Sequence, residues 1–211
     1  MTGLVGAAAV ALVAWFAAGT FWNVRRAGAL MSWMQDGLPR LGARTTVRWL
    51  GSNVVEMNVA EAQHPFASAT LVLFLEPRDL PWWPLARLRG RRDTLILRAG
   101  LRAVPAREFE ALEPGSWSAR EALPRIPREW PGREQLLLVR GEDAEALGRA
   151  EALLGGARGL RVRRLSVRRA EPHFQLHVAL PDRGMAAREF FETVHALAGR
   201  VEGAGGAPGA A

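Results

Sequence analysis

The longest run of apolar positions lies at the start of the chain. Residues 3–24 contain no charged side chain, and only Thr20 and Asn23 among them are clearly polar. A helix rising 1.5 Å per residue would span about 33 Å over this stretch, enough for a hydrocarbon core of about 30 Å. Trp22 falls where an interfacial aromatic residue belongs. The pattern predicts a transmembrane anchor over residues 1–24.

A cleaved signal peptide and a buried core helix are the two alternatives to an anchor. A signal peptide carries its positive charge before the apolar segment, whereas the arginines here follow it, at Arg25 and Arg26. A buried core helix rarely runs this long without a charge. The flanking charges and the length of the run therefore favour an anchor over both alternatives.

A second apolar pattern continues after the arginines, with a helical spacing of three and four residues. Its members are Ala27, Leu30, Met31, Met34 and Leu38. Gly37 and Pro39 then end the helix. We expect residues 25–43 to form a juxtamembrane amphipathic helix. It either lies along the bilayer surface, with Trp33 at headgroup level, or docks on the protein's own domain.

The charges next to the apolar run predict an orientation. Four arginines and one acid, Asp36, follow it within about 20 residues; the arginines are Arg25, Arg26, Arg40 and Arg44. Positive charge beside a span stays on the cytoplasmic side. We therefore expect a single-pass protein of the cell membrane, with its N-terminus outside and its body in the cytoplasm.

The body begins with patterns typical of strands. Residues 44–60 alternate apolar and polar side chains on both sides of a turn at 51–53, which predicts a hairpin. Further elements are expected as strands at 69–75, 93–99 and 107–112 and a short helix at 80–92. Together they predict a β-rich subdomain over residues 44–112. Residues 113–133 follow with four prolines and two tryptophans, and are interpreted as a proline-rich linker.

The last third of the chain predicts the order strand, helix, strand, strand, helix. The expected strands are 135–140, 160–169 and 173–180, and the expected helices are 142–154, with acids in its first turn, and 184–198. This order over residues 134–200 is close to a split βαβ, ferredoxin-like arrangement. The Gly- and Ala-rich residues 201–211 are expected to be a disordered tail. The fold class predicted is α+β, with a mixed or antiparallel sheet and about three helices after the anchor.

The composition narrows the chemistry. All 28 basic residues are Arg, cysteine is absent, and the net charge is +7. Without cysteine there are no disulfides, thiolate metal sites or thiol nucleophiles, and without Lys there is no Walker-type phosphate loop or Schiff base. The basic balance favours anionic partners, either anionic lipid or nucleic acid.

One stretch suggests a second contact with the membrane. Residues 80–92 place Trp82 and Trp83 beside four arginines. Tryptophan side chains favour the membrane–water interface, and arginine side chains bind anionic headgroups, so the two together would suit a contact with the membrane surface. The alternative is that the tryptophans fill the core and the arginines are solvated. The full set of expected membrane-interface residues is Trp22, Arg25, Arg26, Trp33, Trp82 and Trp83.

A second stretch predicts a basic patch on one strand. Its residues are Arg161, Arg163, Arg164, Arg168 and Arg169. With a bulge at 163–164, the apolar residues Val162, Leu165 and Val167 would face inward and the arginines outward. Such a face suits phosphate-bearing lipid or RNA, although no aromatic residue alternates with the arginines to stack bases. An exposed charged strand that resists edge pairing is the alternative.

Catalytic and metal patterns are weak. His173 and His177 would lie about 13 Å apart along one strand, too far to share a metal. Glu108 and Glu110 could pair an acid with a base, but exposed charges on a sheet explain them equally well. We therefore expect no catalytic residues, no metal and no cofactor.

The leading hypothesis is a non-enzymatic interaction or scaffold module at the membrane surface. Its expected partners are the membrane itself, anionic lipid, and a protein or second copy of the chain packed on the small-residue stripe of the span. That stripe is Gly3, Ala7, Ala11, Ala14 and Ala18, and in a segment this rich in Ala a chance arrangement explains it at least as well. A membrane-tethered nucleic-acid-binding protein and an enzyme with a carboxylate-based site remain alternatives.

Overall fold

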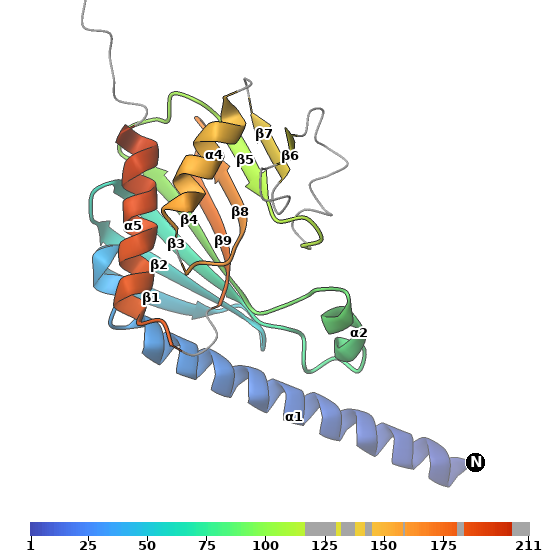
Figure 1. The fold of residues 1–211 in the computed structure, drawn as a ribbon. Coiled ribbons are helices and arrows are strands. Elements are labelled where there is room, and N and C mark those ends of the chain that lie inside the picture. Colours follow the sequence, from blue (N-terminus) through green and yellow to red (C-terminus); the bar gives the residue numbers. More distant parts are fainter. Residues whose placement is uncertain (117–129, 132–137, 142–144, 158, 181–183, 204–211) are drawn as a thin grey trace, which may run out of the picture.

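The computed structural model describes residues 1–116, 130–131, 138–141, 145–157, 159–180 and 184–203. These residues form one antiparallel sheet with helices packed on one face, and a long N-terminal helix leaves this domain at one end (Figure 1). The predicted α+β class is confirmed.

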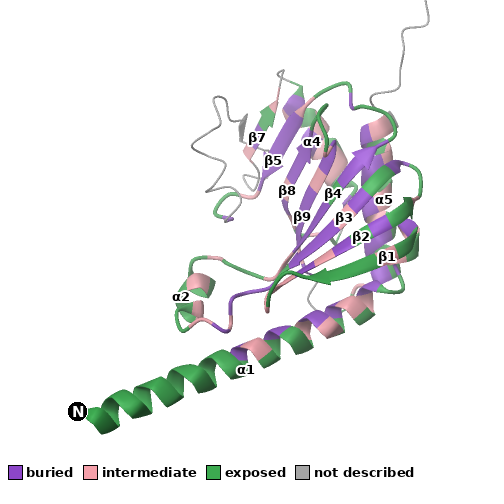
Figure 2. Cartoon of the chain, turned by 180° about the vertical axis from the view of Figure 1, so that it is seen from behind, coloured by how far each residue is buried: buried purple, intermediate pink, exposed green. Residues whose placement is uncertain are grey.

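The N-terminal helix α1 is continuous over Thr2–Met34 and does not break at the arginines. In the described part of the chain it is the one helix long and apolar enough to cross a membrane. Its first half is exposed and stands clear of the domain, as Figure 2 shows. Burial begins at Gly19, and the buried residues of α1 recur at helical spacing as Gly19, Asn23, Ala27, Leu30 and Met34.

The second half of α1 docks on the domain. Ala27 and Met34 are fully buried, and Trp33 packs edge-to-face on Phe190 with a ring separation of 5.5 Å. The Trp33 indole N–H also donates to the Met185 carbonyl oxygen at 3.0 Å. Of the two placements expected for this segment, the structure therefore has the docked one. Trp33 is held by the domain, because its ring and its indole N–H both have partners there; its position relative to the headgroups stays a prediction.

The described strands form a single nine-stranded sheet in the order β1-β2-β3-β4-β9-β8-β5-β7-β6. Their bounds are β1 Gly42–Trp49, β2 Val54–Ala62, β3 Phe66–Phe74, β4 Thr94–Leu101, β5 Phe109–Leu112, β6 Trp130–Pro131, β7 Leu138–Gly141, β8 Val162–Val167 and β9 Phe174–Ala179. β4 pairs with β9 from Thr94↔Ala179 to Ala99↔Phe174. This pairing joins strands from the two halves of the chain into one sheet.

Two helices cover one face of the sheet, α4 (Ala146–Gly155) and α5 (Ala187–Gly203), as Figures 1 and 2 show. A short helix α2 (Trp83–Leu88) and a 3-10 turn η1 (Leu38–Arg40) complete the described helices. The largest fully buried side chains include Phe66 of β3, Phe174 of β9, and Phe190 and Phe191 of α5. Core residues of the central strands, such as Leu95 and Leu176, face Phe190 and Val194 of α5, so the main core lies between the sheet and this helix.

The expected split βαβ unit is present around α4. β5 is antiparallel to both β7 and β8, so β7 and β8 run parallel to each other with β5 between them. Helix α4 connects these two strands on the covered face. The central strand of this unit, β5, thus comes from the segment predicted as the β-rich subdomain, residues 44–112.

Some element boundaries differ from the prediction. Helix α5 continues to Gly203, and Val201, expected in the tail, is buried. The reason is that Val194, Leu197, Ala198 and Val201 continue one apolar face past the predicted end. Helix α4 begins at Ala146 and has no acid in its first turn. Most of the predicted linker at 113–133, and residues 204–211, lie outside the described residues.

Candidate functional site

One end of the sheet, which we call the anchor-side end, gathers three connections beside α1. These are the β1–β2 turn at 50–53, the β3–β4 connection at 75–93 that contains α2, and the chain at 159–161 before β8. The Ser52 hydroxyl donates to Asp79 Oδ2 at 2.6 Å, and the Leu75 amide donates to the Asn53 carbonyl at 2.7 Å. These bonds tie the first two connections together.

Helix α1 meets this end at Gly19. A Cβ atom at Gly19 would overlap the Arg78 carbonyl oxygen and lie 2.5 Å from Asp79 Cα. Only glycine permits so close an approach of the helix to that backbone. One turn further along, Asn23 Oδ1 accepts a hydrogen bond from Arg78 Nη1 at 3.1 Å. The depth at which α1 enters the domain is therefore fixed by backbone contact.

Two carboxylates, the buried Glu76 and the half-buried Asp93, organise the charges around this junction. Asp93 accepts hydrogen bonds from Arg78 Nη1 and Nη2, each at 3.0 Å, and from the Glu76 backbone amide at 2.8 Å. Its Oδ2 also lies 3.4 Å from Arg26 Nε. Glu76 accepts Arg87 at 2.8 Å and the Trp83 indole N–H at 2.6 Å. A buried carboxylate requires such partners, because desolvation of an unpaired charge is costly. The network thus connects α1 to α2 through residues 76–93.

A cleft of about 870 Å³ opens among these groups and contains an excess of positive charge. Its lining includes six arginines, namely Arg26, Arg78, Arg87, Arg92, Arg161 and Arg163. Among its described lining residues, Glu76 and Asp93 are the two acids. Apolar side chains form another part of the wall: Trp22, Leu160, Met185 and Phe190. We call this site the arginine cleft.

Arg163 is the most buried arginine of the cleft, with 7% of its surface exposed. Its Nη1 lies 3.5 Å from the Gly90 carbonyl oxygen, and among the described residues its buried Nε has no hydrogen-bond partner. Burial is the largest effect on the pKa of Arg163 and lowers it; Glu113 raises this pKa, and Arg161 and Arg92 lower it further. A buried cation with an unused donor is thus placed among other cations.

The predicted membrane-interface residues divide by environment. Trp22 and Arg26 line the arginine cleft, and Trp83 binds Glu76 within it. Trp82, the residue before α2, is 59% exposed. Arg25 is exposed on α1. Neither of these tryptophans fills the core, since Trp82 is exposed and Trp83 is only half-buried. A membrane contact at these residues stays a prediction.

The five arginines predicted as one basic patch lie in three places. Arg161 and Arg163 line the cleft, and Arg161 is bound by Glu113 at 2.9 Å. Arg164 forms an ion pair with buried Glu110 on the uncovered face of the sheet. Arg168 and Arg169 are exposed beyond the other end of β8. The bulge at 162–164 is present, but the expectation that every arginine faces outward is wrong for Arg163, because the bulge turns this side chain into the cleft.

The uncovered face of the sheet carries a buried histidine. His177 on β9 is opposite Ile96 on β4 and Arg164 on β8. Burial, followed by the charges of Arg164 and Arg98, lowers the pKa of His177 to about 3. His177 is therefore neutral near pH 7. Its Nε2 lies 2.6 Å from Gln175 Nε2, and a neutral ring nitrogen can accept a hydrogen bond from this amide.

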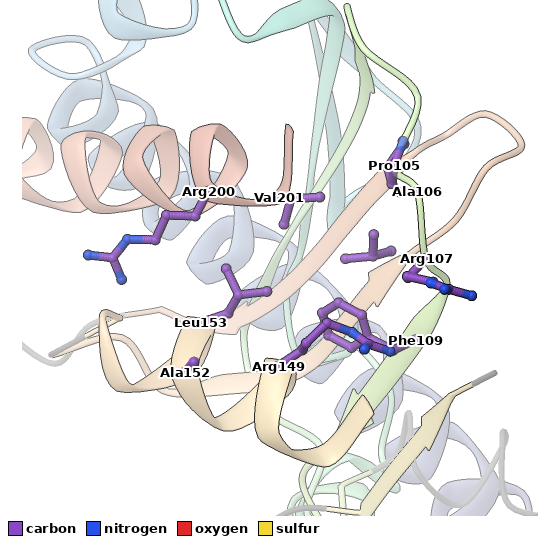
Figure 3. A pocket seen from close by; sticks show the side chains of 10 residues that line it. Pro105, Ala106, Arg107, Phe109, Arg149, Ala152, Leu153, Arg200 and Val201 are labelled. Atoms are coloured by element: carbon purple, nitrogen blue, oxygen red, sulfur yellow. The ribbon is translucent and has the colours of Figure 1, made fainter. Parts of the chain in front are cut away.

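A smaller cavity of about 250 Å³ lies at the other end of the domain, between α4, α5 and the start of β5 (Figure 3). Phe109, Leu153 and Val201 form apolar walls. Arg149 and Arg200 are at its margin, and in Figure 3 the guanidinium of Arg200 points away from Phe109. Its described lining contains neither an acid nor a histidine, so the arginine cleft is the better-equipped site for a polar ligand.

The residues considered for catalysis or metal binding form contacts within the domain. Within the described ranges, no cluster of three or more histidine, aspartate and glutamate side chains is arranged to hold a metal ion. His173 Nδ1 accepts the Leu101 amide at 3.0 Å, which fixes the position of this ring. Glu108, expected as a possible catalytic partner of Glu110, accepts the Arg169 amide at 2.8 Å. Both carboxylates are thus engaged by basic or backbone groups.

Comparison with known proteins adds no assignment: no protein-family model matches the chain, and no curated protein matches it in sequence.

The sequence patterns missed the two acids that build the cleft. Glu76 follows the apolar strand β3 closely, and Asp93 directly precedes β4, with the arginine-rich connection between them. Acids at strand ends resemble ordinary turn residues. The sequence did contain one indication: each acid is close to several arginines, which favours an ion pair between the carboxylate and a guanidinium group.

Proposed function

We propose that this protein is a single-pass membrane protein whose basic domain is a non-enzymatic interaction module held against the cytoplasmic surface of the cell membrane. The observation that carries the proposal is the division of α1 into an exposed apolar half and a half docked on the domain. If the first half of α1 is held in the bilayer and the second half is packed on the domain, the domain has little freedom to move away from the membrane.

The contact at Gly19 supports a close approach to the membrane. The uncharged stretch continues to Val24, five residues beyond Gly19. At a helical rise of 1.5 Å per residue, these five residues correspond to about 7.5 Å along the helix axis. The anchor-side end therefore overlaps about the last 7.5 Å of the uncharged stretch. Interfacial elements bury their apolar faces about 5–10 Å into the headgroup boundary. The connection at 75–93 is therefore at the level of the interface.

The surface of the anchor-side end fits this environment. Leu88 is 84% exposed on α2, with Trp82 and Leu85 also exposed. Trp49 and Leu50 are exposed at the β1–β2 turn, which is bonded to the same connection. Figure 1 shows α2 on the side of the sheet where the free half of α1 departs. Tryptophan and leucine beside arginine are typical of interfacial membrane contacts.

The orientation rests on the arginines that follow the span. Arg25 and Arg40 are partly or fully exposed, and their side is the cytoplasmic one by the positive-inside rule. The nucleic-acid alternative has less support, since the five patch arginines lie in three places and Arg163 is buried.

The test is a topology and extraction experiment on the full chain. Reporter fusions at the C-terminus and after Met1 are combined with a carbonate wash of the membrane fraction. We expect a cytoplasmic C-terminus in a protein that resists the wash. A cleaved or exported C-terminus would instead mean that residues 3–24 are a secretion signal.

A further inference from the structure

We infer that the arginine cleft binds a phosphate ester, with Arg163 and Arg92 as its central ligands, and that an anionic lipid headgroup is its source. The choice of a lipid source rests on the proposed function, whereas the phosphate chemistry rests on the cleft alone. The two sources to be separated are a lipid headgroup and a soluble phosphate ester.

The charge balance of the cleft is the first support. Arg26 and Arg78 share Asp93, Arg87 is bound by Glu76, and Arg161 is bound by Glu113. Arg92 Nη1 donates to the Arg91 carbonyl at 2.7 Å, and Arg163 Nη1 lies near the Gly90 carbonyl. These carbonyls are neutral acceptors, and among the described residues neither side chain forms an ion pair; Glu113 and Glu76 act on Arg163 only at longer range. An anion placed between Arg92 and Arg163 would supply the direct partner that both side chains lack.

The unused donor is the second support. Arg163 is more than nine-tenths buried, and its Nε has no partner among the described residues. A buried N–H without an acceptor is costly, so this position favours a ligand that supplies one. Guanidinium groups bind phosphate oxygens with two parallel hydrogen bonds, and the Nε edge of arginine is suited to this geometry.

The shape of the cleft favours an amphipathic ligand over a free ion. Its volume of about 870 Å³ greatly exceeds what one phosphate fills. Trp22, Leu160 and Met185 supply an apolar wall beside the arginines. Trp22 belongs to α1 at the proposed membrane level, so a lipid could enter with its glycerol and first methylenes on this wall. Basic pockets beside membrane spans bind anionic headgroups by the same principle.

The experiment uses the full chain purified in neutral detergent and native mass spectrometry to count bound lipids. The probes are phosphatidylglycerol and phosphatidylcholine, and glycerol 1-phosphate is the soluble phosphate ester. Arg163→Gln and Arg92→Gln remove one charge each from the cleft. Arg48→Gln removes the same charge from the exposed strand β1 and is the matched control.

We expect phosphatidylglycerol to bind at least tenfold more tightly than phosphatidylcholine. Each cleft variant should lose about tenfold in affinity for it, as expected when one charged hydrogen-bond donor is removed, whereas the control should change less than about twofold. Because Arg92 is exposed, its variant decides the result if Arg163→Gln fails to fold.

The outcomes separate the two proposals. Binding of glycerol 1-phosphate with the same dependence on Arg92 and Arg163 would support the phosphate site with a soluble source. Equal binding of the two lipids, or equal losses in the control and cleft variants, would overturn the inference. Failure of the membrane proposal appears instead as release by carbonate, which leaves the glycerol 1-phosphate measurement valid.

Discussion

Replacing Gly19 with alanine tests the contact that sets the depth of α1. The new Cβ would overlap the Arg78 carbonyl oxygen and lie 2.5 Å from Asp79 Cα. Both neighbours are backbone atoms, so neither can move aside by a change of rotamer. The helix would have to shift away from residues 76–79. Gly28, in the same helix, is the matched control, because a Cβ there meets nothing within 4 Å.

The expected size of the effect follows from two opposing terms. Alanine is about 1 kcal/mol better than glycine inside a helix, and this term is the same at both positions. Overpacking against an unyielding wall costs about 1–3 kcal/mol, and this term applies at Gly19 alone. The Gly19→Ala protein should therefore be about 1–3 kcal/mol less stable than the Gly28→Ala protein, which should be slightly more stable than wild type.

The assay is urea unfolding of the full chain in neutral detergent, combined with hydrogen exchange of residues 19–34. We expect the Gly19→Ala protein to unfold at lower urea and to exchange faster in the docked half of α1. Equal stability and equal exchange in the two variants would refute the proposed backbone contact.

Two further predictions concern the domain itself. The pKa of His177 is about 3 in the folded protein and about 6.5 when unfolded, so the unfolded chain takes up a proton first as the pH falls. Between about pH 6.5 and pH 3, the free energy of unfolding of wild type should therefore fall relative to that of His177→Gln by about 1.4 kcal/mol for each pH unit. Urea unfolding at a series of pH values measures this difference. Parallel pH profiles for the two proteins would contradict this account. Phe191→Ala should cost about 3–5 kcal/mol of folding stability, since this α5 ring is 1% exposed. Phe21→Ala, at a position 68% exposed, should cost little in the same detergent unfolding assay. A small loss of folding stability for Phe191→Ala would mean that α5 does not pack on the core as described.

The sequence predicted most elements correctly where apolar periodicity was strong. The β1–β2 hairpin alternates cleanly about its turn, and α5 shows Phe191, Val194 and Leu197 on one face, all of them buried. The order of the strands could not be predicted in the same way. β4 pairs with β9, about 80 residues later, and β5 lies between β7 and β8. Such pairings depend on long-range packing that local patterns do not encode.

The candidate site was predicted only in part. Trp22, Arg26, Trp83, Arg161 and Arg163 were identified as basic or interfacial residues, and the structure brings them to one cleft. Their grouping could not be foreseen because it depends on the bulge in β8 and on the meeting of α1 with residues 76–93. Composition identified the charge of these residues, and tertiary structure determined which of them face each other.

The claim that the anchor-side end lies at the membrane surface can be tested by a depth measurement. The chain has no cysteine, so single spin labels can be attached at introduced cysteines and their access to oxygen and to a water-soluble nickel complex compared in bilayers. Leu12→Cys is in the exposed half of α1, Leu88→Cys is on α2, and Val104→Cys is at the opposite end of β4. We expect hydrocarbon-like access at position 12, interfacial access at 88 and water-like access at 104. Water-like access at position 88, equal to that at 104, would contradict the account.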